Sequence, residues 1–185
     1  MVAVSFLRGV NLGPNRRMRM ESLRAVYEAL GLRNVQTLLQ SGNVLFSCAE
    51  RGYAKLGARI EDAVEQEFGF RAAAVQRTAS ELRDVVARNP FAGRTDIDPS
   101  KLLVDFLGSA PGPEAEARLA ALRVEPDEIR IVGNQLYIYY PNGMARPKLT
   151  AAQLDRALGK LPATGRNWNT VTKLTELAAR MEASE

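Results

Sequence analysis

Arginine residues gather near the start of the chain, in a stretch that also contains glycine and asparagine. Residues 1–24 carry five arginines against the single acid Glu21, whereas the remainder has 20 basic and 20 acidic residues. Arg16, Arg17 and Arg19 lie just before an apolar pattern typical of a helix. Cations at a helix N-terminus oppose the helix dipole, which favours negative charge there. This stretch therefore predicts a site for a small anion, such as a phosphate or a carboxylate.

Two later segments also place cations before a predicted helix. Lys148 lies two residues before Thr150, which we expect to cap one helix, and Arg166 and Asn167 precede the last helix, which we expect Asn169 to cap. Neither capping nor core packing requires Arg166 or Asn167, so we expect both to contact a ligand. If the three helix starts converge, they form one anion site in a cleft between two halves of the protein. Its members would be Arg16, Arg17, Lys148 and Arg166. Separate surface positions are the alternative, and the sequence leaves it open.

Polar residues in two turns complete the set of candidate ligand contacts. Asn11 lies between Gly9 and Gly13, and glycine lets a backbone approach a ligand closely. The turn at residues 40–43 offers a hydroxyl and amides, although a hairpin turn needs the same small polar residues. The candidate ligand-binding residues are Arg8, Asn11, Arg16, Arg17, Ser41, Asn43, Lys148, Arg166 and Asn167.

The chain has no histidine and one cysteine, which excludes several kinds of chemistry. Serine–histidine and cysteine–histidine nucleophile pairs, most zinc sites and an intrachain disulfide are ruled out. Cys48 has no clear cationic neighbour in sequence, so we expect a buried, unreactive thiol. No catalytic residue and no metal ligand emerges, the cofactor is unknown, and whether the protein is an enzyme stays open.

Hydrophobic periodicity predicts the elements that must position these residues. The first half has the order βαββαβ, with expected strands at 2–7, 35–40, 43–48 and 70–77 and helices from Met20 and over 56–68. The second half repeats this order, with strands at 101–107, 128–132 and 135–140, a short strand near Ala163, and helices from Pro113 and after Thr150. The sequence thus predicts an α+β protein of two consecutive ferredoxin-like halves, each an antiparallel sheet with helices on one face, plus a C-terminal helix. We expect halves at 1–88 and 101–185, with a linker at 89–100 that is rich in turn-forming residues.

Two tyrosines suggest a different kind of ligand. Tyr137 and Tyr139 alternate on one face of their predicted strand near Arg130, so one sheet face could expose rings on which bases stack. The strand at 43–48 lacks the aromatic signature of RNA-recognition sheets, and paired halves could bury the rings instead.

Three sequence strings carry a resemblance to a known family. They are FLRGVNLGPNRRM at 6–18, LLQSGNVLF at 38–46, and YYPNGMARPKLT with RNWNTVTKL at 139–150 and 166–174. Together they resemble a family of small bacterial proteins catalogued as domain of unknown function number sixteen ninety-seven, over nearly the whole chain. This chain has Pro14 where members have a second glycine, and Ala145-Arg146-Pro147-Lys148 where they have Gly-Arg-Ser-Lys. Pro14 removes a backbone N–H that could hold phosphate. The resemblance implies an α+β fold and supplies no activity, catalytic residue or cofactor.

These observations favour one function and leave two others open. No charged leader precedes an apolar stretch and no apolar run approaches the ~20 residues that span a bilayer, so we expect a cytoplasmic protein with no membrane partner. We favour binding of a small phosphorylated or carboxylate ligand in a cleft between the halves. The first alternative is a nucleic-acid-binding module that uses the N-terminal basic patch, against which the charge balance beyond residue 24 argues. The second is a dimeric structural or interaction protein without a small ligand; the sequence does not choose between monomer and homodimer.

Overall fold

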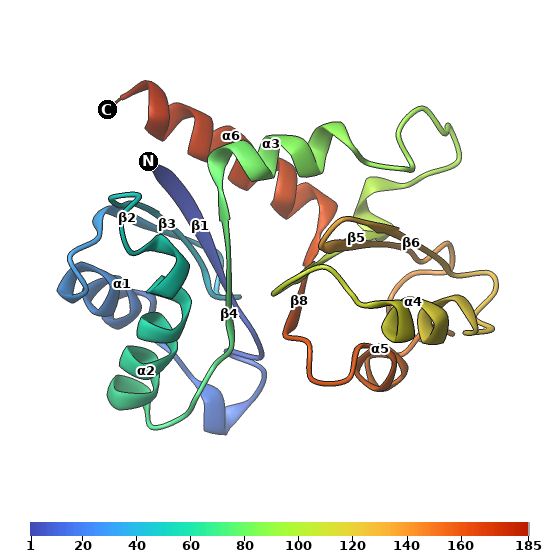
Figure 1. The fold of residues 1–185 in the computed structure, drawn as a ribbon, viewed down its shortest axis with the longest axis horizontal. Helices are drawn as coiled ribbons and strands as arrows, with labels where there is room; N and C mark the ends of the chain where they lie inside the picture. Colours follow the sequence, from blue (N-terminus) through green and yellow to red (C-terminus); the bar gives the residue numbers. More distant parts are fainter. Residues whose placement is uncertain (185) are drawn as a thin grey trace. The chain divides into compact units, whose positions relative to one another are not determined.

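The computed structural model describes residues 1–184, which divide into two compact units. The first unit comprises Met1–Asp84 together with the chain from Lys173 onward, and the second comprises Val85–Thr172. Among the described residues there are eight strands and six α-helices (Figure 1). The expected α+β class, with two similar halves and a C-terminal helix, is confirmed.

The first unit is built on an antiparallel sheet in the order β2-β3-β1-β4. Its strands are β1 (Val2–Leu7), β2 (Arg33–Leu38), β3 (Asn43–Ser47) and β4 (Ala74–Thr78). The helices α1 (Met20–Ala29) and α2 (Leu56–Phe68) lie together on one side of this sheet (Figure 1). Their apolar faces and the facing strand residues form one core cluster that includes Ala3, Tyr27, Phe46 and Ile60. Within this core the hydroxyl of Tyr27 donates to Ser5 Oγ at 2.9 Å, which satisfies two buried polar groups.

The second unit repeats the arrangement, with an antiparallel sheet in the order β6-β7-β5-β8. Its strands are β5 (Leu102–Leu107), β6 (Glu128–Val132), β7 (Gln135–Tyr139) and β8 (Ala163–Asn167). The helices α4 (Pro113–Ala120) and α5 (Ala151–Leu158) lie together on one side of it (Figure 1). Thr150 caps α5 as expected, in a capping box in which the side chains of Thr150 and Gln153 each accept from the other residue's backbone N–H.

Two helices contribute residues to both units. Helix α3 (Ala79–Ala87) follows β4 directly, and α6 (Trp168–Ala183) follows β8 directly. A capping box begins α3, because Glu81 accepts from the Thr78 backbone N–H and Thr78 Oγ1 accepts from the Glu81 backbone N–H. Arg83 of α3 forms an ion pair with Glu182 of α6, so these helices lie side by side in the first unit.

Three local expectations are wrong. The β2–β3 hairpin pairs Leu38 with Asn43, so a four-residue turn replaces the expected two-residue turn, and Leu39 adopts a positive φ of 60°. Asn167, rather than Asn169, provides the cap of α6, since its Oδ1 accepts from the Asn169 backbone N–H at 3.0 Å. The expected strand at 70–77 begins later, at Ala74.

Of the two alternatives for Tyr137 and Tyr139, exposure for base stacking is wrong, because both rings are buried. Tyr137 is 0% exposed and Tyr139 is 5% exposed. The hydroxyl of Tyr137 donates to the Val85 carbonyl at 2.7 Å. The hydroxyl of Tyr139 donates to the Asp96 carbonyl at 2.9 Å. These rings serve the packing of the second unit, and their faces are not open for base stacking.

Residues 89–100 pack closely within the second unit. Phe91 is buried against Tyr139, with ring centroids 6.1 Å apart. Arg94 pairs with Asp96 and reaches Glu128 of β6 at 2.9 Å. This segment is therefore tied to the second sheet, and its role as a boundary between independent domains stays a prediction.

Candidate functional site

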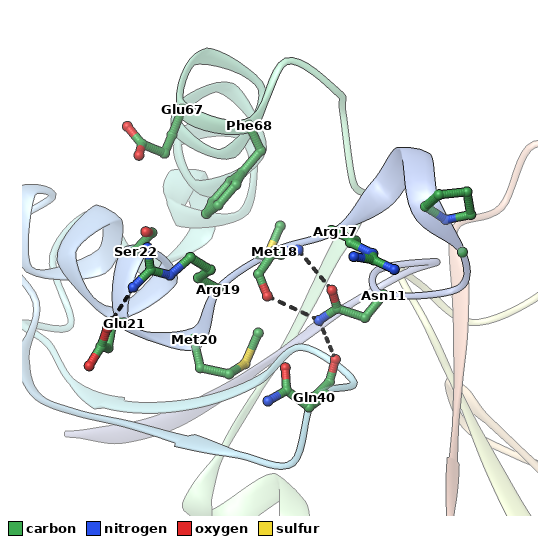
Figure 2. A pocket seen from close by; sticks show the side chains of 12 residues that line it. Asn11, Arg17, Met18, Arg19, Met20, Glu21, Ser22, Gln40, Glu67 and Phe68 are labelled. Atoms are coloured by element: carbon green, nitrogen blue, oxygen red, sulfur yellow. Dashed lines mark hydrogen bonds and ion pairs between the residues drawn. The ribbon is translucent and has the colours of Figure 1, made fainter.

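The first unit contains an open hollow beside the loop that joins β1 to α1 (Figure 2). Its volume is about 1120 Å³. Most of its lining comes from the loop and from the first turn of α1. Gln40 from the β2–β3 turn and Glu67 and Phe68 from the end of α2 complete it. The hollow therefore lies at the junction of three segments that are distant in sequence.

Asn11 fixes the shape of the loop. Its Nδ2 donates to the carbonyls of Gln40 at 2.7 Å and Met18 at 3.2 Å, and its Oδ1 accepts from the Met18 N–H at 2.7 Å (Figure 2). Its own N–H donates to the Arg16 carbonyl at 2.8 Å. Its φ of 56° is left-handed, a conformation that asparagine tolerates better than most residues. The predicted site residue Asn11 thus lines the hollow and also holds its wall in place.

Cationic groups line the hollow near the N-terminus of α1. Arg19 occupies the N-cap position of α1 without a side-chain cap bond, and it forms an exposed ion pair with Glu21 at 3.3 Å. Arg17 is exposed and, within residues 1–184, makes no hydrogen bond or ion pair. The first turn of α1 therefore presents uncapped N–H groups beside an available guanidinium, an arrangement suited to an anion.

The other predicted residues of the first unit have structural contacts. Arg16 donates from Nη2 to the Arg71 carbonyl at 2.8 Å, and its guanidinium carbon lies 4.7 Å from the centroid of the Phe70 ring. Asn43 is fully buried, and its Nδ2 donates to the Leu38 carbonyl and to Ser41 Oγ, both at 2.9 Å. Asn43 and Ser41 thus organise the hairpin turn. Arg8 is exposed at the end of β1.

In the second unit, Lys148 is exposed while the backbone beside it is held firmly. The N–H groups of Lys148 and Leu149 donate to Oδ2 of the buried Asp127 at 2.7 and 2.8 Å. One carboxylate thereby fixes the segment that leads into α5 and leaves the Lys148 side chain on the surface.

Arg166 and Asn167 have structural roles that we did not expect: Arg166 is buried, and Asn167 caps a helix. Arg166 is 7% exposed, and its Nη1 donates to Thr164 Oγ1 and to the Gly165 carbonyl, both at 2.8 Å. Burial lowers the pKa of its guanidinium to about 10, and the negative charge of Asp105 partly opposes this shift. Asn167 caps α6 and also donates from Nδ2 to the Ser100 carbonyl at 2.7 Å. The convergence of these residues with Arg16, Arg17 and Lys148 stays a prediction.

Nothing in the sequence indicated that Phe68 contributes to the hollow. Phe68 continues the four-residue apolar spacing of α2, which predicts a core residue, and it does pack against the core of the first unit. Gln40 belongs to the turn at residues 40–43, which the sequence offered as a source of amides, and it does line the hollow. Only the folded chain brings these two residues to the loop.

The described residues contain neither a group of metal ligands nor a helix that could span a membrane. Among residues 1–184, no three or more histidine, cysteine, aspartate or glutamate side chains are grouped so that they could hold a metal ion. In the same residues, no helix combines the length and the apolar character that crossing a membrane requires.

The fold and the hollow define a class of small α+β protein with two repeated four-stranded halves, the first of which carries a basic strand-to-helix loop. The chain belongs to the family described as "Protein of unknown function (DUF1697)", whose model matches residues 1–137. The matched region includes every residue that lines the hollow.

One similar solved structure is that of "conserved bacterial protein SP0830 from Streptococcus pneumoniae". It is 19% identical to this chain with a TM-score of 0.68, and the alignment covers 96% of this chain and 98% of that one. At this identity the similarity supports the fold alone. No curated protein matches the chain.

Proposed function

We propose that the protein binds a small phosphorylated or carboxylate ligand at the hollow beside the β1–α1 loop. Arg17 supplies the main charged contact, and the N–H groups in the first turn of α1 donate to the remaining anion oxygens. The observation that carries this proposal is that one hollow is lined by a helix N-terminus without a side-chain cap and by Arg17, which has no partner within residues 1–184. We assign no reaction to the site, and we place the protein in the cytoplasm as part of the proposal.

The length of the loop supports this function. Twelve residues, 8–19, join β1 to α1, whereas the equivalent connection from β5 to α4 takes five residues, 108–112. Connections between a strand and a helix need only about 2–6 residues. Val10 and Met18 anchor the loop in the core, whereas Leu12 between them is 82% exposed, so the middle of the loop adds little to the core. A long loop that is held by Asn11 and lines a hollow fits a binding role better than a purely connecting one.

The charge distribution supports a compact ligand over a nucleic acid. Glu21 and Glu67 line the same hollow as Arg17 and Arg19, so the positive potential is local. An extended polyanion needs a continuous basic track. The burial of Tyr137 and Tyr139 also removes the rings on which bases could have stacked.

Calorimetric titration of the purified protein with a panel of phosphorylated metabolites, nucleotides, carboxylic acids and short oligonucleotides tests the proposal. We expect at least one small anion to bind, and we expect Arg17→Ala to weaken it about tenfold or more, since a charge-assisted bond contributes roughly 1.5–3 kcal/mol. Arg51→Ala is the matched control, because Arg51 is an exposed arginine of the same unit that does not line the hollow.

Two outcomes would overturn the proposal. In the first, Arg17→Ala binds every small anion as well as Arg51→Ala does. In the second, only oligonucleotides bind, and their binding disappears at ~300 mM salt, which is the behaviour of a nucleic-acid patch.

A further inference from the structure

The hollow is too large and too apolar to be occupied by an inorganic anion alone. Its volume of about 1120 Å³ slightly exceeds the roughly 300–1,000 Å³ of sites that hold whole small molecules. Besides the charged groups, its lining includes the aromatic ring of Phe68 and the thioethers of Met18 and Met20. A ligand that fills this space must therefore carry a body beyond its anionic group.

The side chain of Phe68 is the main feature of the apolar wall. It projects from the end of α2 toward Met18 and Arg19 (Figure 2). It is half-buried, packs against the core of the first unit, and tilts against Phe70 with ring centroids 6.4 Å apart. A ring that is held on one side by the core and open on the other is a preformed surface for a flat partner.

The remaining lining suits a flat ring with polar edges. Methionine sulfur contacts aromatic rings favourably. The amide of Gln40 and the hydroxyl of Ser22 line the hollow, and in the described chain neither side chain has a hydrogen-bond partner. Amide and hydroxyl groups of this kind recognise the edge of a base or the hydroxyls of a sugar.

We propose that the ligand is a nucleotide, with its phosphate at Arg17 and its base against Phe68. This inference rests on the proposed function, which supplies the anionic end of the ligand. The inference adds a planar ring of the ligand as the second determinant of specificity. Phe68 is the residue that recognises this ring.

Binding of three probes to the wild-type protein tests the inference: adenosine monophosphate, ribose 5-phosphate and dodecyl phosphate. We expect the nucleotide to bind at least about fivefold more tightly than ribose 5-phosphate, since stacking a base on an aromatic side chain contributes roughly 1–3 kcal/mol. In saturation-transfer NMR, the base protons should receive more saturation from the protein than the ribose protons.

Variants at two neighbouring phenylalanines separate recognition from packing. Phe68→Leu keeps an apolar side chain in the core, and we expect it to lose the advantage of the nucleotide while binding ribose 5-phosphate within about twofold of wild type. Phe70→Leu is the matched control, because Phe70 is also half-buried and does not line the hollow. It should bind both probes within about twofold of the wild-type protein.

The outcomes distinguish this inference from the proposed function. If the nucleotide and ribose 5-phosphate bind equally and both lose affinity in Arg17→Ala, the recognition of a planar ring is wrong and the anion site is supported. Tighter binding of dodecyl phosphate than of the nucleotide also overturns it, in favour of an aliphatic body. Absence of binding by every phosphorylated compound overturns this inference, and it overturns the proposed function as well if no carboxylic acid binds either.

Discussion

Arg77 and Arg166 occupy equivalent positions in the two sheets. Arg77 pairs with Val4 across β4 and β1, and Arg166 pairs with Val104 across β8 and β5. Both side chains are buried, and each donates Nη1 to the carbonyl of the preceding residue, at 2.7 and 2.8 Å. Burial lowers the pKa of both guanidinium groups. The structural repeat therefore extends to one buried cation in each half.

The packing of Arg166 predicts an order of stability between two of its variants. Arg166→Met and Arg166→Ala both remove the charge, but only alanine leaves the space of the side-chain stem empty. We expect the free energy of unfolding of the alanine variant to be about 2–4 kcal/mol lower than that of the methionine variant, as for other buried methionine-to-alanine changes. Urea denaturation at neutral pH measures the difference. Equal stability of the two variants would show that the stem of Arg166 is not packed.

Buried tyrosines predict a loss of stability at alkaline pH. Burial raises the pKa of Tyr137 to about 12, from the usual value of about 10 for a tyrosine hydroxyl. Since the unfolded chain releases this proton first, the stabilisation is complete below pH 10 and is lost as the pH rises toward 12. Each such group contributes about 1.4 kcal/mol per pH unit in that window.

Tyr137→Phe tests this pH dependence. We expect the variant to lose about 1 kcal/mol at pH 7, because the Tyr137 hydroxyl no longer donates to the Val85 carbonyl. Its free energy of unfolding should then fall less steeply than that of wild type between pH 10 and 12. Urea denaturation at a series of pH values measures both effects, and parallel curves for the two proteins would contradict the prediction.

Features encoded by short segments were predictable from the sequence. The helix over Leu56–Phe68 ends at Gly69, whose φ of 75° is the left-handed conformation that glycine favours at this position. The capping box of Thr150 and Gln153 also needs only four neighbouring residues. Such signals depend on local backbone chemistry, so tertiary packing changes them little.

Features that depend on long-range packing were not predictable. Asn167 and Asn169 flank Trp168, and either fits an N-cap until the preceding strand is known to extend to Asn167. The sequence ATGRN of β8 has no apolar alternation, so nothing local marks Arg166 as buried. The arginines of the hollow are neighbours in sequence, so they could be predicted as a group. Phe68 joins them only through the packing of α2, so its place in the hollow could not be predicted.

Two glycines with similar backbone angles predict different costs of substitution. Gly42 has φ of +72°, and a Cβ added there would lie 2.7 Å from Val10 Cγ2 and 2.8 Å from Leu7 Cβ. Gly69 has φ of +75°, and its added Cβ would meet nothing within 4 Å. Alanine at either position adopts a strained left-handed conformation, but only at Gly42 does it also overpack the core. We expect Gly42→Ala to be less stable than Gly69→Ala by about 1–3 kcal/mol in urea denaturation. Equal losses would mean that the turn shifts freely.

The hydrogen bonds of Asn11 predict that loop rigidity contributes to ligand affinity. Asn11→Gly tolerates the φ of 56° and keeps Arg17, but it removes the side-chain bonds to Met18 and Gln40. We expect the loop to lose its fixed shape, which lowers affinity for the tightest-binding phosphorylated compound by about fivefold to thirtyfold through lost preorganisation. Calorimetric titration measures this change.

The matched control for Asn11→Gly is Asn15→Gly. Asn15 is exposed in the same loop, and its side chain makes no hydrogen bond within residues 1–184. This variant adds glycine to the loop without removing the bonds that hold it, so its affinity should stay within about twofold of wild type. If both variants bind alike, the Asn11 bonds do not hold the binding surface. If only Asn11→Gly loses affinity while Arg17 is intact, the loop acts as a preformed wall of the site, and charge alone does not account for binding.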